Sequence, residues 1–149
     1  MNRELVMKFL TNGYNCSQSV LCYFAEEFNL DHLAAKRIAE AFESGQFQGT
    51  TCGAVCGAYM VLGLKYGSDK PEHRQIMEEK VNKFNKLFKE NCNSTLCRDL
   101  LGEDISTKGG LEKIINQGLL EKVCPNAIFT SIKILEKFNT PELYTLAQK

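Results

Sequence analysis

The chain has 149 residues, 44% hydrophobic and 24% charged, which is typical of a soluble globular protein of one domain. Its 18 basic and 18 acidic residues give a formal net charge of zero, and this argues against nucleic-acid binding, which usually needs a basic excess. No apolar run approaches the ~18 residues that span a bilayer, and the charged start lacks the apolar segment of a signal peptide. We therefore expect one domain over residues 1–149, cytoplasmic, with no nucleic-acid or membrane partner.

The first third of the chain predicts three helices in succession. Apolar residues at helical spacing indicate a helix over 2–10. Asn15 is a good N-cap for a second helix over 16–28, and Asp31 is a good N-cap for a third over 32–44. The apolar stripe expected on the third helix comprises Leu33, Ile38, Ala41 and Phe42.

A glycine-containing loop leads into the most apolar segment of the chain. Thr50 or Thr51 is the expected N-cap of a helix over 52–66, which contains three glycines and has almost no polar face. A helix that is apolar on all sides belongs in the interior, so we expect this small-residue-rich helix to be central and the most buried. Glycines such as Gly57 indicate either tight helix packing or the approach of a cofactor to the backbone.

The second half continues the helical pattern. Pro71 suits the start of an amphipathic helix over 71–91. A compact segment over 92–102 follows, then a short helix over 111–117 and a last helix over 125–138 that starts at a proline and ends before Thr140 and Pro141. Because no segment alternates with period two, the prediction is an all-α, single compact bundle-like domain of about six to seven helices.

Seven cysteines are the unusual feature of the composition. An odd number of cysteines in a chain without a signal peptide favours reduced thiols, redox groups or metal ligands over structural disulfides. The apolar neighbours of Cys22 indicate that this residue belongs to the core. The seven are Cys16, Cys22, Cys52, Cys56, Cys92, Cys97 and Cys124.

Four of these cysteines fall at predicted helix N-termini: Cys16, Cys52, Cys97 and Cys124. Free amides and the helix dipole at such positions favour a thiolate, which is the form that attacks disulfides and binds metals. We expect the four sulfurs to meet in one pocket. On the same grounds, Cys52 should be among the most acidic thiols of the metal-free protein.

Cys56 follows Cys52 by one helical turn, so the two share a face and could co-ligand a metal. The chain has no Cys-x-x-Cys motif, no haem-attachment motif and no paired histidines. His32 and His73 read as surface residues near charged helix ends, which argues against hydrolytic chemistry.

The order and context of four cysteine motifs resemble a known family. The motifs are Asn15-Cys16-Ser17-Gln18, Thr51-Cys52-Gly53-Ala54-Val55-Cys56-Gly57, Cys97-Arg98-Asp99-Leu100-Leu101-Gly102 and Val123-Cys124-Pro125. Over about residues 13–138 the chain is similar to the redox-active family named for its pattern C, GCAxxG, C, C. The family's cysteines correspond to Cys16, Cys52, Cys97 and Cys124. The chain departs from the pattern at Thr51, where the family name implies glycine, and at Gly53.

The resemblance implies redox activity through these cysteines. A related domain accompanies split-Soret-type cytochromes, and there an iron–sulfur cluster is implied. Three functions stay open: electron transfer or redox sensing through an iron–sulfur centre, most simply [2Fe–2S]; thiol–disulfide exchange with Cys52 as nucleophile; and a non-enzymatic helical interaction domain, either zinc-stabilised or without metal. The redox partner is unidentified, and the sequence is compatible with a homodimer.

Overall fold

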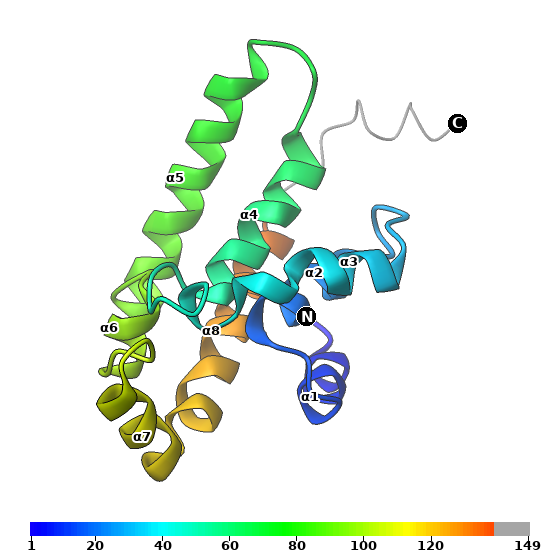
Figure 1. Ribbon diagram of the computed structural model, residues 1–149. Coiled ribbons are helices and arrows are strands. Elements are labelled where there is room, and N and C mark those ends of the chain that lie inside the picture. The colour runs from blue at the N-terminus through cyan, green and yellow to red at the C-terminus, as the bar shows by residue number, and fades with distance from the viewer. Residues whose placement is uncertain (139–149) are drawn as a thin grey trace.

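The computed structural model describes residues 1–138, and helices form the fold (Figure 1). The all-α prediction is confirmed: the described residues contain no strand, and one isolated bridge joins Thr51 to Leu96. None of the helices in this part of the chain is long and apolar enough to cross a membrane. The elements are α1 (Arg3–Thr11), α2 (Cys16–Phe24), α3 (His32–Ala39), the 3-10 helix η1 (Glu40–Gly45), α4 (Gly53–Tyr66), α5 (His73–Cys92), α6 (Cys97–Leu101), α7 (Lys108–Gln117) and α8 (Leu119–Glu136).

Helix α4 occupies the centre, as its composition predicts, and it packs against α2, α5 and α8 (Figure 1). Its glycines differ in their surroundings. A Cβ at Gly57 would lie 2.8 Å from the carbonyl oxygen of Ser17 and 2.9 Å from the Cβ of Val20, whereas a Cβ at Gly63 would meet nothing within 4 Å. Gly57 therefore permits the close approach of α2 to α4, which is the helix-packing interpretation.

The predicted stripe of the third helix is wrong. Leu33 and Ile38 are 62% and 55% exposed, while Ala35 and Ala39 are fully buried. The small side chains face the core because α3 packs closely against α2. The α-helix also ends at Ala39, and the 3-10 helix η1 continues the chain to Gly45.

The last helix begins six residues earlier than predicted. Helix α8 starts at Leu119, so Pro125 lies inside it rather than in its first turn. Gly118 ends α7 with φ +60° and is also the N-cap of α8, which leaves no loop between the two helices. The expected break at Thr140 and Pro141 lies outside the described residues.

The buried residues form two hydrophobic clusters. The main core surrounds α4 and includes Val55, Leu62 and Ile128. The small core joins α6 to α7 and the first turns of α8; its buried members are Cys97, Leu101 and Ile114. Apolar residues of α8, among them Leu119 and Leu120, complete the small core and explain why the helix starts before Pro125. The candidate functional site lies at the seam where these two cores meet.

Candidate functional site

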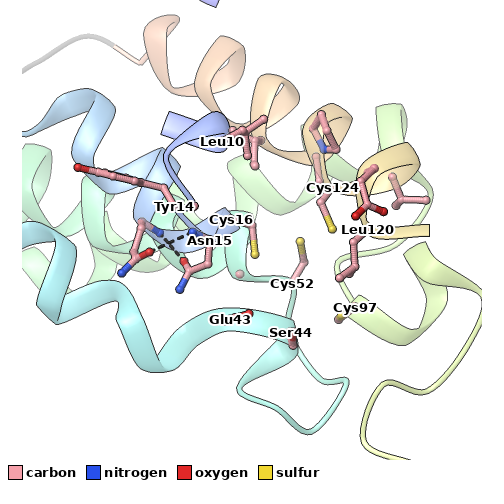
Figure 2. Close-up of a pocket in the computed structure, with 18 of the residues that line it drawn as sticks. Leu10, Tyr14, Asn15, Cys16, Glu43, Ser44, Cys52, Cys97, Leu120 and Cys124 are labelled. Carbon is pink, nitrogen blue, oxygen red and sulfur yellow. Dashed lines mark hydrogen bonds between the residues drawn. The ribbon is translucent and has the colours of Figure 1, made fainter. Parts of the chain in front are cut away.

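A cavity of about 830 Å³ at this seam is lined by Cys16, Cys52, Cys97 and Cys124. The four residues come from α2, the residue before α4, α6 and α8. Figure 2 shows the sulfurs of Cys16, Cys52 and Cys124 pointing toward one another, with Cys97 at the adjoining edge. The prediction that these four cysteines share one pocket is confirmed.

The start of α2 fixes the position of Cys16. The side chain of the N-cap Asn15 accepts a hydrogen bond from the backbone N–H of Gln18 (2.8 Å), and the Gln18 side chain accepts one from the backbone N–H of Asn15 (3.0 Å). The predicted N-cap role of Asn15 is confirmed, and the reciprocal bond to Gln18 makes the pair a capping box. A Cβ at Gly53 would overlap the Cys16 sulfur, so the glycine makes room for that sulfur beside the start of α4.

Backbone pairing holds Cys52 and Cys97 side by side. The N–H of Cys52 donates to the carbonyl oxygen of Thr95 (2.8 Å), and the N–H of Cys97 donates to the carbonyl oxygen of Thr50 (2.6 Å). Two segments about 45 residues apart in sequence thus run antiparallel for a few residues. Since the local pattern around each cysteine is helical, the sequence carried no signal for this pairing.

The placement of Cys124 differs from the prediction. Cys124 lies inside α8 rather than at its N-terminus, because the helix begins at Leu119. The start of its own helix therefore offers no free amides to Cys124. Cys16 and Cys97 are the first residues of their helices, and Cys52 is the N-cap of α4, so the other three do lie at helix starts.

Burial, not helix position, controls the pKa of Cys52. Burial raises this pKa well above its usual value of 9.0, the Cys16 sulfur raises it further, and the backbone N–H groups of Ala54 and Val55 lower it by less. The same effects act on Cys16: burial raises its pKa, and the backbone N–H groups of Ser44 and Ser17 lower it by less. The expectation that Cys52 is among the most acidic thiols is wrong, because desolvation outweighs the helix-start amides.

The sulfurs also disfavour one another's ionisation. Burial raises the pKa of Cys97 to about 11, with Cys16 adding to the rise. Burial raises the pKa of Cys124 to about 12, and Cys16 and Cys97 contribute in the same direction. At neutral pH the metal-free cavity therefore holds four neutral thiols. A bound cation would offset the repulsion between thiolates and favour the ionised form.

The remaining cysteines lie outside this arrangement. Cys56 does not line the cavity; its sulfur accepts a hydrogen bond from the side-chain N–H of Gln46 (3.2 Å). Cys22 is buried in the main core, as predicted. Cys92 packs at the edge of the same core.

The histidines are also away from the four sulfurs. His32 is exposed, as expected, with its ring nitrogen 2.9 Å from the Tyr14 hydroxyl. His73 is half-buried, and its Nδ1 lies 3.1 Å from the carbonyl oxygen of Tyr66. Neither histidine lines the cavity.

Sequence patterns did not indicate three acidic residues that line the cavity, Glu40, Glu43 and Glu121. The charges of Glu43 and Glu121 raise the pKa of Cys124. They come from η1 and α8, which are distant in sequence, so no motif spacing connects them to the cysteines. Within residues 1–138, no group of three or more Cys, His, Asp or Glu side chains is arranged so that it could hold a metal ion.

Comparison with known proteins identifies a family to which the chain is similar. No curated protein and no solved structure matches the chain. Residues 14–138 match the family described as "Putative redox-active protein (C_GCAxxG_C_C)". This match spans all four cavity cysteines and most of the fold, and the chain belongs to this redox-active family.

Proposed function

We propose that the protein holds a [2Fe–2S] cluster through Cys16, Cys52, Cys97 and Cys124 and uses it for electron transfer or redox sensing. The observation that carries the proposal is the convergence of these four thiols on one cavity. Four cysteine thiolates are the usual ligand set of such a cluster. When bound, the cluster would supply one-electron redox chemistry, in line with the redox-active family.

The residues fit this group in number, type and surroundings. A [2Fe–2S] cluster takes its thiolates as two pairs, one pair per iron, so it does not require three side chains around one point. The described residues form no such set of three. A structural zinc ion places four ligands around one centre, and this arrangement therefore supports zinc less well.

The protein itself would supply hydrogen bonds and exclude water. Backbone N–H groups of Ser44 and Ser17 favour the ionised form of Cys16, and those of Ala54 and Val55 do the same for Cys52. Apolar side chains form much of the cavity wall, and they limit the access of water to the sulfurs. These lining residues include Leu10, Leu100, Leu101, Leu120 and Ile128.

Thiol–disulfide exchange with Cys52 as nucleophile is the second candidate, favoured by its position at the start of α4. Two observations weigh against it. The Cys52 residue is only 7% exposed, and burial keeps its pKa well above the usual value. A reactive thiol needs both access and a substantial thiolate fraction at neutral pH.

Single substitutions test the cluster. The wild-type protein, purified without oxygen and reconstituted with iron and sulfide, should show visible thiolate-to-iron absorption. Each of Cys16→Ala, Cys52→Ala, Cys97→Ala and Cys124→Ala should lose most of this absorption. Cys22→Ala is the control, because Cys22 is as buried as Cys52 but does not line the cavity. A variant set in which all four cavity substitutions retain wild-type absorption would refute the proposed ligands.

A further inference from the structure

The end of η1 and the two residues after it form an unusual left-handed turn over residues 44–47. Ser44, Gly45, Gln46 and Phe47 have φ values of +54°, +61°, +57° and +58°. L-residues other than glycine rarely adopt this conformation, and consecutive residues almost never do, because Cβ approaches the backbone too closely. Such strain persists only where the surrounding structure enforces it, and it concentrates at functional sites.

This left-handed turn lies against the cavity cysteines. The backbone N–H of Ser44 donates a hydrogen bond to the Cys16 sulfur, and both residues line the cavity (Figure 2). A Cβ at Gly45 would lie 2.9 Å from the Cβ of Cys97 and would overlap the backbone of Thr50. The left-handed turn therefore contacts two of the four cavity cysteines, Cys16 and Cys97, and the backbone just before the third, Cys52.

Gln46 fastens the turn to residues on both sides of Cys52. Its side-chain N–H groups donate to the carbonyl oxygen of Thr51 (3.0 Å) and to the sulfur of Cys56 (3.2 Å). Its side-chain oxygen accepts a hydrogen bond from the Thr50 hydroxyl (2.8 Å). These bonds tie a strained segment to the residues just before Cys52 and to the first turn of α4.

Arg98 secures the far end of the segment. Its Nε donates to the carbonyl oxygen of Gly49 (2.9 Å), and a terminal nitrogen of its guanidinium donates to the carbonyl oxygen of Gln48 (3.2 Å). Because Arg98 follows Cys97 directly, the turn is attached on one side to the Cys52 segment and on the other to the Cys97 segment.

We propose that the left-handed turn is the scaffold that aims the Ser44 amide at Cys16, and that Gln46 is its positioning residue. This inference rests on the proposed cluster. Hydrogen bonds to ligand sulfurs stabilise the more negative, reduced state and so raise the reduction potential. Without Gln46 the strained turn relaxes, the Ser44 amide leaves Cys16, and the potential falls.

The measured step is a simple electron uptake. One electron passes from a chemical reductant such as dithionite to the loaded site, whose net charge becomes more negative by one unit. No covalent bond of the protein forms or breaks. A purely structural role for Gln46 would change unfolding but would leave the midpoint potential of the folded, loaded protein unchanged.

The chain offers a matched control. Gln48 has the same side chain, lies two residues away on the same segment and is exposed. The experiment compares Gln46→Leu with Gln48→Leu in cluster-loaded protein by potentiometric titration followed by visible absorption. The expected result is a lower midpoint potential for Gln46→Leu and the wild-type potential for Gln48→Leu. Equal potentials in all three proteins would overturn the proposal.

If Gln46→Leu does not fold, a second pair of variants tests the same proposal. Gln46→Glu keeps the acceptor for Thr50 but loses both donated bonds, and Gln48→Glu corrects for the added charge. Hydrogen exchange of the metal-free proteins supplies an independent measurement, since the amides of Phe47 and Thr50 are hydrogen-bonded within this segment. Both should exchange faster in Gln46→Glu than in Gln48→Glu, and equal exchange would contradict the positioning role. Absence of a cluster in wild-type protein would instead refute the proposed function, while the exchange comparison would still decide the role of Gln46.

Discussion

At the scale of single residues, desolvation raises the pKa of the cavity thiols, and hydrogen bonds from backbone amides lower it. The amides at the start of α4 do favour the Cys52 thiolate, as its position predicts, but burial opposes them more strongly. Sequence could locate the amides because capping patterns are local. It could not locate the burial, which comes from α2, α6 and α8 closing over the same cavity.

The raised thiol pKa values predict that the metal-free protein loses stability in alkali. Cys97 and Cys124 stay protonated in the folded state up to about pH 11 and 12, whereas in the unfolded chain they ionise near 9.0. Above pH 9.0 the unfolded state therefore binds fewer protons than the folded state, and the free energy of unfolding falls as pH rises.

Chemical denaturation of metal-free protein at a series of pH values between about 8 and 11 measures this loss. Cys124→Ala should show a shallower decline than wild type, because one raised pKa has been removed. Identical pH slopes for the two proteins would show that Cys124 is not desolvated in solution.

At the scale of elements, α4 is the part of the fold that sequence predicted best. Its bounds and its central position follow from a long run of small and apolar residues. The sequence left two alternatives for Gly57, and its close contact with Ser17 and Val20 of α2 decides for helix packing. Elements whose partners are distant were predicted less well. The burial of Ala35 and Ala39 depends on the close packing of α3 on α2, and the start of α8 at Leu119 depends on the small core.

Replacement by alanine should have opposite effects on stability at two glycines of α4, Gly57 and Gly63. Gly57→Ala places a methyl group against Ser17 and Val20, so it should destabilise the protein by about 1–3 kcal/mol. Gly63→Ala enters open space on the same helix and should stabilise it by about 0.5–1 kcal/mol through helix propensity. Urea denaturation of both variants checks the pair, and a Gly57→Ala protein as stable as Gly63→Ala would mean that α2 and α4 are not in close contact.

At the scale of the whole molecule, the cavity joins two cores of unequal size. Cys16 and Cys52 belong to the main core, whereas Cys97 and Cys124 belong to the small core. Sequence predicted which cysteines would meet, because their motifs share local features and a family order. It could not predict the seam, which exists because α6, α7 and the start of α8 form a separate cluster.

This arrangement predicts that a bound cluster stabilises the small core more than the main core. Only Cys97, Leu101 and Ile114 are buried within the small core, so in metal-free protein α6 and α7 should open more readily than α4. Hydrogen exchange before and after loading with iron and sulfide should show the largest slowing in residues 97–117. Uniform slowing along the chain, or none in this range, would argue against ligands from both cores.

The most direct measurement for the four-cysteine site is the iron and sulfide content of protein purified without oxygen. A [2Fe–2S] cluster on these cysteines predicts about two iron and about two sulfide ions per chain, together with visible absorption that Cys124→Ala lacks. Cys124 is the decisive residue because it is the one proposed ligand that α8 supplies. Colourless protein that carries zinc, or protein without metal whose four thiols all react freely with an alkylating reagent, would contradict the account.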